Sequence, residues 1–315
     1  MDKGYDILVV ITPKDYERVE RLLPRTMAGL PGRDVIFIGS SQLGEILPEE
    51  IAGRRIRFLN EDDVIPFSQV HEVMRTAIGV DELSRGITGW YYQQFLKMQY
   101  ARICQDEYYM TWDGDTIPCQ KFSMFQEGSG APYLDVKDEY CERYFITLGK
   151  LFPRMGKVIR PSFISEHMLF SKEIMEQMLA EMEANENLEG ATFWEKVIHA
   201  ISAENLQKNS FSEFETYGTY VAFRHTGKYK LREWHSFRLA GQFFDPEKIC
   251  DRDFAWLAKD FDAVSFEKNQ TIREDNRNLF DNPYYQERLS ARQMLQIAQE
   301  EFQMGYHEGW DLFKS

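Results

Sequence analysis

The chain has 315 residues, of which 43% are apolar, and carries a formal net charge of −14. The length suffices for one large or two small domains. The acidic charge excludes nucleic acid as the main partner and opposes binding to an anionic membrane, because both are bound through clustered Lys and Arg. The four cysteines are widely spaced without a C-x-x-C pair. Neither a zinc site nor a disulfide framework is therefore expected.

The hydrophobic runs are too short for a membrane span, which needs roughly 18 to 20 apolar residues. Residues 1–4 do not resemble the start of a signal peptide. We therefore expect a cytoplasmic protein without a transmembrane segment, for which a peripheral membrane contact stays open.

Strand and helix patterns alternate along the first part of the chain. Residues 5–12 form a mostly apolar run that suits a buried strand, and an amphipathic helix is predicted near 15–29. The strand pattern returns at 34–40 and 55–59, whereas the signals over 62–89 are mixed. This alternation predicts an α/β fold, with a mainly parallel sheet and helices on both faces.

A helix is predicted from residue 89 to residue 104. Its apolar side chains recur at helical spacing and should face the core, namely Tyr92, Leu96 and Ile103. Gln93 and Lys97 are four residues apart and share another face of this helix. Because the helix leads into the next strand, Lys97 is a candidate diphosphate contact; its alternative is a solvated surface lysine.

That next strand, residues 108–112, ends in Asp113-Gly114-Asp115. Two carboxylates at a strand end supply the hard oxygen ligands that Mg²⁺ or Mn²⁺ prefers, and glycine lets a diphosphate approach the backbone closely. The sequence therefore predicts a metal-diphosphate site, with an ordinary turn as the alternative.

The ordered set of motifs resembles bacterial glycosyltransferases of the GT-A (Rossmann-like) fold, with the nearest likeness to an uncharacterised group of polysaccharide-type transferases. The resemblance covers roughly residues 5–240. Its most specific motifs are Gly-Trp-Tyr-Tyr-Gln-Gln-Phe-Leu-Lys-Met at 89–98, the D-x-D strand, Ser-Glu-His-Met-Leu-Phe at 165–170 and Ser-Glu-Phe-Glu-Thr-Tyr-Gly at 212–218.

The resemblance implies a nucleotide-sugar donor, most simply a UDP-sugar, bound at the carboxyl ends of the strands with Mn²⁺ or Mg²⁺. Thr12 and Lys14 would border the base and ribose, and Gln93 and Lys97 would line the same cleft. Asp115 would bind the metal, and Asp113 would bind the ribose or the metal. A saccharide hydroxyl would be the acceptor.

Further residues follow from the later motifs. Ser212 followed by Glu215 reads as a helix capping box, which makes Glu215 structural by default. The resemblance implies an acidic general base at the start of a helix in this part of the chain, for which Glu213 is the first choice and Glu215 the second. The resemblance also implies a third metal ligand from a downstream histidine. His235 is preferred to His225 because it follows an apparent extra strand at 219–225. Glu166 and His167 are candidate acceptor contacts, although His167 equally suits the core.

After residue 245 the composition becomes charge-rich and helical, with an amphipathic run near 284–313. We therefore predict a catalytic domain over 1–245 and a helical C-terminal extension over 246–315, packed on it. The run has few basic residues, which disfavours a membrane contact there.

Two other functions stay open. Asp113-Gly114-Asp115-Thr116 also matches the D-x-D-x-T start of haloacid-dehalogenase-type phosphatases, but no G-D-x-x-x-D cluster follows. A non-catalytic nucleotide-sugar binder is favoured if Glu213 and Glu215 are both buried in capping contacts.

Overall fold

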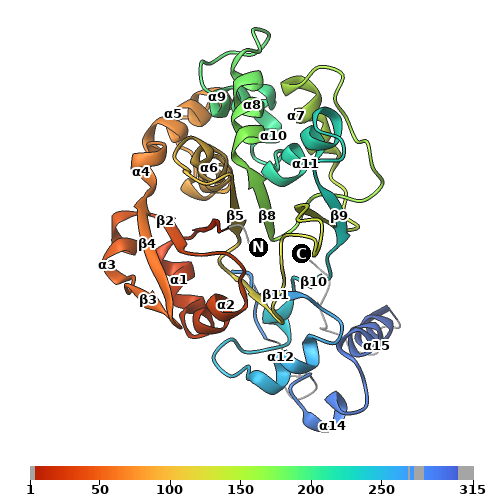
Figure 1. The fold of residues 1–315 in the computed structure, drawn as a ribbon. Coiled ribbons are helices and arrows are strands. Elements are labelled where there is room, and N and C mark those ends of the chain that lie inside the picture. Colours follow the sequence, from red (N-terminus) through yellow and green to blue (C-terminus); the bar gives the residue numbers. More distant parts are fainter. Residues whose placement is uncertain (1–3, 269, 273–279, 304–315) are drawn as a thin grey trace. The chain divides into compact units, whose positions relative to one another are not determined.

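The computed structural model describes residues 4–268, 270–272 and 280–303, and the chain forms two compact units of three segments each (Figure 1). The first unit comprises Met1–Pro13, Pro31–Gly114 and Ser123–Trp234. The second unit comprises Lys14–Leu30, Asp115–Phe122 and His235–Ser315. The predicted division at residue 245 stays a prediction, and the two units are described separately.

A six-stranded sheet forms the centre of the first unit, with the strand order β3-β4-β2-β1-β5-β8. Its strands are β1 (Asp6–Val10), β2 (Val35–Gly39), β3 (Glu50–Ile51), β4 (Arg54–Asn60), β5 (Tyr108–Trp112) and β8 (His167–Ser171). The inner strands β4, β2, β1 and β5 pair in parallel, whereas the edge strands β3 and β8 pair antiparallel. The predicted mixed, mainly parallel α/β sheet is confirmed.

The apolar runs of β2 and β5 are buried along their whole length, and β1 is buried at all but its last residue. Continuous apolar strands of this kind require cover on both sheet faces. Helices flank the sheet, as predicted (Figure 1). Those of the first unit are α3 (Ser41–Ile46), α4 (Glu61–Val64), α5 (Phe67–Ile78), α6 (Arg85–Gln99), η2 (Tyr100–Arg102), α7 (Glu142–Leu151), α8 (Lys172–Glu183), α9 (Phe193–Ala200), α10 (Ala203–Leu206) and α11 (Glu213–Arg224).

Two local predictions need correction, and the region 62–89, where the signals are mixed, contains the twelve-residue helix α5. Ile103 follows η2 and is 38% exposed, so its predicted place in the core was wrong, whereas Tyr92 and Leu96 are buried. The apparent strand at 219–225 was also wrong, because α11 continues through Arg224. Its Thr, Tyr and Val have β propensity, but the helix begins earlier with a good cap and packs on α6, α7 and α8.

The first unit also contains a parallel pair of short strands, β7 (Tyr133–Val136) and β9 (Lys230–Glu233). The register sets Asp135 opposite Arg232. This pairing brings two residues almost one hundred positions apart into contact, and it becomes important at the candidate site.

The second unit has its own sheet and core. Its three-stranded sheet has the order β10-β11-β6, formed by β10 (Ser236–Phe237), β11 (Ala263–Ser265) and β6 (Thr116–Pro118). Its helices are α1 (Pro13–Val19, beginning at the unit boundary), η1 (Glu20–Leu22), α2 (Leu23–Gly29), η3 (Ala240–Gln242), α12 (Asp251–Leu257), α14 (Pro283–Gln286) and α15 (Ala291–Gln303). The predicted helix near 15–29 is thus helical but in three pieces.

The part of the chain after residue 245 contains helices as expected, and it also supplies β11. Of the predicted run 284–313, α14 and α15 account for part, and residues 304–313 lie outside the described residues. Among the residues with described positions, no helix combines the length and apolarity needed to cross a membrane.

Candidate active site

The end of β5 is the centre of the candidate site in the first unit. Asp113 follows the last residue of β5, at the sheet edge where parallel strands present their carboxyl ends. Because β8 runs antiparallel to β5, its first residue, His167, pairs with Trp112. The backbone N–H of Asp113 donates to the carbonyl of Glu166 at 2.8 Å. Strand pairing thus brings the predicted acceptor residues beside the predicted D-x-D motif.

Lys97 connects Asp113 to the start of α11. Its ammonium lies 2.7 Å from Oδ1 of Asp113 and 2.9 Å from Oε1 of Glu213. It also lies 4.7 Å from the centroid of the Phe214 ring. The Lys97 side chain is 2% exposed and that of Glu213 5%, whereas that of Asp113 is 34% exposed. Asp113 is therefore the member of this group that presents a surface to solvent.

The charges of this group explain its pKa values. Burial alone would lower the pKa of Lys97, but Asp113 and Glu213 outweigh it and raise the pKa above the usual value. Lys97 therefore remains a cation. Burial raises the pKa of Glu213, although Lys97 opposes this effect. With its charge already matched by two carboxylates, Lys97 acts as their counter-ion; its predicted contact with a diphosphate stays a prediction.

A second contact fixes the first residue of α11 to α6. The backbone N–H of Glu213 donates to Oε1 of Gln94 at 3.0 Å, and Ser212 caps the helix by accepting from the N–H of Glu215 at 3.2 Å. Gln94 was missed by the sequence analysis. Its position three residues before Lys97, which places both polar side chains on one side of α6, was the available signal. The predicted Gln93 is half-buried.

The capping box at Ser212 forms only in part. The Glu215 carboxylate, rather than returning to the backbone of Ser212, accepts from Oγ of Ser162 at 2.6 Å and from the N–H of Phe163 at 3.1 Å. Burial raises its pKa. Glu215, which is 3% exposed, thus joins α11 to the 162–163 loop. These contacts fit the structural alternative, and its catalytic role stays a prediction.

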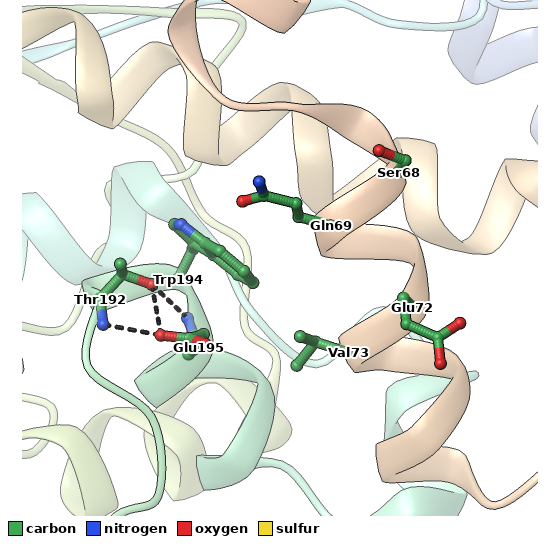
Figure 2. Close-up of a pocket in the computed structure, with 7 residues that line it drawn as sticks. All are labelled: Ser68, Gln69, Glu72, Val73, Thr192, Trp194 and Glu195. Atoms are coloured by element: carbon green, nitrogen blue, oxygen red, sulfur yellow. Dashed lines mark hydrogen bonds between the residues drawn. The ribbon is translucent and has the colours of Figure 1, made fainter.

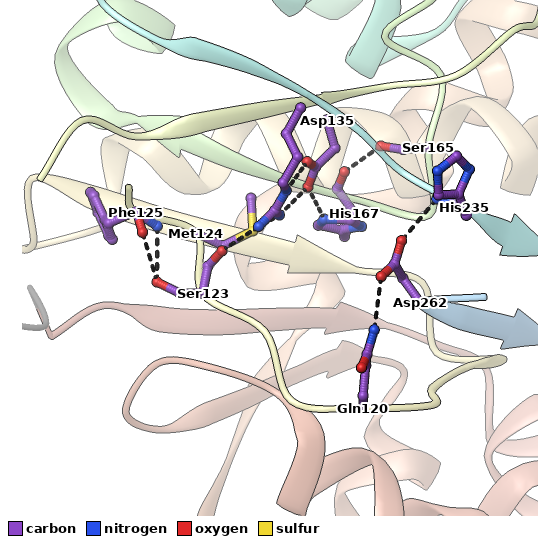
Figure 3. A network of polar contacts seen from close by, with 10 residues as sticks. Gln120, Ser123, Met124, Phe125, Asp135, Ser165, His167, His235 and Asp262 are labelled. Atoms are coloured by element: carbon purple, nitrogen blue, oxygen red, sulfur yellow. Dashed lines mark hydrogen bonds and ion pairs between the residues drawn. The ribbon is translucent and has the colours of Figure 1, made fainter. Parts of the chain in front are cut away.

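Glu166 and His167 are both buried in ionic networks. The Glu166 carboxylate lies 2.8 Å from the ammonium of Lys137. Nε2 of His167 lies 2.7 Å from Oδ2 of Asp135 (Figure 3), and Asp135 also binds the guanidinium of Arg232 at 2.6 and 2.7 Å. This arrangement fits the core alternative for His167. Its acceptor role, and that of Glu166, stay predictions.

The sequence analysis missed Asp135, Lys137 and Arg232. Asp135 is 2% exposed. Burial by itself would raise its pKa, but the hydrogen bonds from Arg232 and His167 have the larger combined effect, so the pKa is lowered. A carboxylate within the apolar run Tyr-Leu-Asp-Val was the signal that could have found it. Its partner lies almost one hundred residues later, which no local pattern reveals.

Packing against β1 explains why position 114 is a glycine, which the sequence did not show. A Cβ at this position would lie 2.7 Å from Cδ1 of Ile11 and 3.1 Å from Cγ1 of Val9. Close approach to β1 therefore requires glycine here, whether or not a diphosphate also approaches. Thr12, two residues beyond the end of β1, is exposed.

The remaining predicted residues belong to the second unit. The carboxylate of Asp115 lies 3.9 Å from the guanidinium of Arg18, which also pairs with Asp15 at 2.9 Å. Lys14 is exposed. His235 is exposed, and its backbone N–H donates to Asp262 at 2.9 Å (Figure 3). Their predicted roles at a donor site stay predictions.

A metal would find few ligands from the protein alone. Within residues 4–268, 270–272 and 280–303, no three His, Cys, Asp or Glu side chains gather as they would around a metal ion. Mg²⁺, however, is commonly held by one or two carboxylates together with water and substrate phosphates. The carboxylate of Asp113, which is partly exposed and whose Oδ1 accepts from Lys97, fits that pattern.

An open pocket of the first unit lies elsewhere, at α5 and the start of α9 (Figure 2). It has a volume of about 490 Å³ and is lined by Ser68, Gln69, Glu72, Val73, Thr192, Trp194 and Glu195. The Glu195 carboxylate accepts from the N–H of Thr192 at 2.8 Å as part of a complete capping box. The carboxylate of the half-buried Glu195 thus serves helix capping, and the lining includes none of the predicted site residues.

Comparisons with known proteins match this chain to one family model and to solved structures. The sequence model of a family of unknown function, DUF6492, matches residues 6–281. The structure is similar to the apo form of mouse xyloside xylosyltransferase 1, with a TM-score of 0.44 and 11% sequence identity, over 86% of this chain and 100% of that chain. Such a low score carries no argument about activity. No curated protein matches the chain.

Proposed function

Because this chain belongs to the DUF6492 family, whose function is unknown, we propose its activity from its sequence motifs and its structure. The protein is a metal-dependent glycosyltransferase of the GT-A fold. It transfers a sugar from a nucleotide diphosphate, UDP in the simplest case, to a hydroxyl of a saccharide acceptor in polysaccharide biosynthesis. The proposal rests on the motif resemblance together with the site at the end of β5.

The observation that most supports the proposal is the contact of one buried ammonium with both Asp113 and Glu213. Lys97 links the strand-end carboxylate, proposed to face the donor, to the helix-start carboxylate, proposed to be the base. The two residues are one hundred positions apart, and both were selected from sequence as members of one site. Their connection through Lys97 is expected if they serve a single reaction.

In this proposal Asp113 and Asp115 hold Mg²⁺ or Mn²⁺ together with the donor diphosphate, and His235 is a candidate third ligand. The metal supplies Lewis-acid stabilisation of the charge that develops on the departing diphosphate. Glu213 takes the proton from the acceptor hydroxyl, and its raised pKa increases its strength as a base. Thr12 and Lys14 contact the nucleoside, and Glu166 and His167 border the acceptor.

The experiment compares donor binding and turnover in matched carboxylate variants. Asp115→Asn should abolish the Mn²⁺ dependence of UDP binding measured by calorimetry, and Asp113→Asn should weaken binding. Glu213→Gln should keep donor binding but reduce kcat by about 100-fold or more, as expected for loss of a general base. Glu215→Gln is the control, because its contacts with Ser162 and Phe163 predict lost stability with kcat preserved.

Two outcomes would contradict the assignment. UDP binding by Asp115→Asn with an unchanged Mn²⁺ requirement would remove Asp115 from the metal site. Full turnover by Glu213→Gln at saturating donor and acceptor would remove the base. Hydrolysis of a generic phosphate ester without UDP binding would support the phosphatase alternative.

A second candidate function, a non-catalytic nucleotide-sugar binder, is favoured by one observation. Glu213 and Glu215 are 4% and 3% exposed, and both carboxylates are already bonded within the protein. If wild type binds the nucleotide-sugar donor but transfers the sugar to no member of a panel of saccharides, the result would support the binder.

A further inference from the structure

The segment from residue 140 to residue 160 has a charge opposite to that of the chain. Between residues 141 and 160 there are five basic residues and one acidic residue, a net charge of +4 within a chain of −14. The basic residues are Arg143, Lys150, Arg154, Lys157 and Arg160, and all five are exposed. The net negative charge of the whole chain therefore does not describe this segment, which is locally cationic.

The cationic side chains are not neutralised by neighbouring acids. Within the described part of the chain, none of Arg143, Lys150, Arg154 and Arg160 forms an ion pair. The buried carboxylates pair instead with other basic residues, such as Lys97, Lys137 and Arg232. The ammonium of Lys157 donates to the carbonyl of Pro161 at 2.9 Å. Four unpaired cations on one segment are consequently available to an external anion.

Apolar side chains are exposed on the same segment. Tyr140 is 64% exposed, Ile146 51% and Val158 44%. The rings of Tyr140 and Phe145 stack with centroids 5.7 Å apart, and the Lys157 ammonium lies 5.1 Å from the Phe145 centroid. These contacts place the segment after α7 against the residues at its start.

Helix α7 separates its buried and exposed residues by spacing. Thr147, Leu148 and Leu151 are buried, and α7, which lies beside α11 in Figure 1, packs on α9 and α11. Arg143, Ile146 and Lys150 are three and four residues apart, so they share the opposite, exposed side. We call this side together with Tyr140, Phe145 and residues 154–160 the 140–160 surface.

We propose that the 140–160 surface docks the protein on an anionic lipid bilayer. Cationic side chains attract anionic headgroups, and aromatic and aliphatic side chains between them enter the boundary between headgroups and acyl chains. A soluble polyanion would use the cations but leave Ile146 and Val158 exposed to water. The combination of unpaired charge and exposed aliphatic groups therefore favours the bilayer.

The test is sedimentation of the full chain with vesicles of phosphatidylcholine alone or with added phosphatidylglycerol. Wild type should bind only the anionic vesicles, and binding should fall with added salt, because exposed charges are screened. Each basic residue near the surface contributes about fivefold to the partition coefficient. The variant Arg143→Gln/Lys150→Gln/Arg160→Gln should consequently lose about 100-fold.

A matched control removes the same charge elsewhere. Lys121, Lys228 and Lys230 are exposed and lie outside this surface. Their triple substitution by Gln should leave vesicle binding within about twofold of wild type if the local surface, rather than net charge, determines binding. Ile146→Ser/Val158→Ser should weaken binding but keep its salt dependence.

Several outcomes would overturn the proposal. These are no binding of wild type to anionic vesicles, equal binding to phosphatidylcholine alone, or equal losses in the charge variant and its control. Self-association of wild type that the charge variant abolishes, without vesicle binding, would instead assign the surface to a second copy of this acidic chain. Vesicle binding needs neither donor nor metal, so its result is independent of the transferase proposal.

Discussion

At the residue scale, Lys97 is a buried cation whose stability depends on its two partners. Its side chain is 2% exposed and contacts both Asp113 and Glu213. Burying a charge without a partner is costly, whereas a matched group that is fully hydrogen-bonded is tolerated. Lys97 therefore fixes the positions of two carboxylates, and its removal should affect folding as well as the site.

Lys97→Met should destabilise the protein by on the order of 3–5 kcal/mol, because it leaves Glu213 buried without its cation. The double variant Lys97→Met/Glu213→Gln should recover part of that loss, since no unpaired charge remains in the buried position. Urea unfolding of the four proteins in this cycle measures the coupling. Simple additivity of the two single effects would contradict the ion-pair interpretation.

Asp135 gives a second residue-scale prediction, on acid stability. Burial opposes its charge, but Arg232 and His167 lower its pKa below the ordinary value. A lowered folded-state pKa gives stability that is present above the unfolded value of about 3.9 and is lost as pH falls through the folded value. Wild type should therefore lose stability steeply below about pH 4.

Asp135→Asn should lower stability at neutral pH by on the order of 3 kcal/mol and flatten this acid dependence. Chemical denaturation between acid and neutral pH measures both effects. Asp138→Asn, an exposed carboxylate three residues later, is the control. An acid dependence in Asp135→Asn as steep as in wild type would show that another group is responsible.

At the element scale, α11 approaches its neighbours through a glycine. A Cβ at Gly218 would lie 2.1 Å from Cγ of Phe163, a separation that real atoms do not reach. The Phe163 ring is 1% exposed and has little freedom to move. The same 162–163 loop receives the Glu215 carboxylate, so helix and loop are joined by packing and by hydrogen bonds.

Gly218→Ala should therefore destabilise the protein by at least about 2 kcal/mol, because overpacking displaces the ring or the helix. Gly89→Ala is the matched control within α6. A Cβ there meets nothing within 4 Å, so the variant should gain about 0.5–1 kcal/mol from helix propensity alone. Opposite shifts in Tm are expected, and shifts of the same sign would contradict this packing account.

At the scale of the whole molecule, the second unit draws one hydrophobic core from separate parts of the chain. Leu22, Ile117 and Cys119 share a buried cluster with residues beyond 245, among them Phe254 and Trp256. Strand β6 also pairs with β11 in the second unit. The core therefore cannot form from the chain before residue 245.

A chain ending at residue 245 should lose solubility or show a markedly lower Tm than the full chain, because the apolar partners of Leu22 and Ile117 are removed. Soluble yield and thermal unfolding measure this effect. A truncated chain as soluble and as stable as the full chain would support 1–245 as an independent domain.

The sequence by itself determined the features that depend on local pattern. The apolar runs of β1, β2 and β5 predicted strands buried on both faces, and their alternation with helices predicted the parallel sheet. Ser212 was correctly identified as a helix cap. These properties follow from periodicity and backbone chemistry, which act over a few residues.

Only the tertiary structure decided the long-range pairings. The contacts of Lys97 with Glu213 and of Asp135 with Arg232 each join residues about one hundred positions apart. The basic residues of the 140–160 surface are visible in the sequence, but their exposure is shown only by the structure. Pairing of this kind depends on which elements meet and which side chains lose water together, so no window along the sequence contains the information.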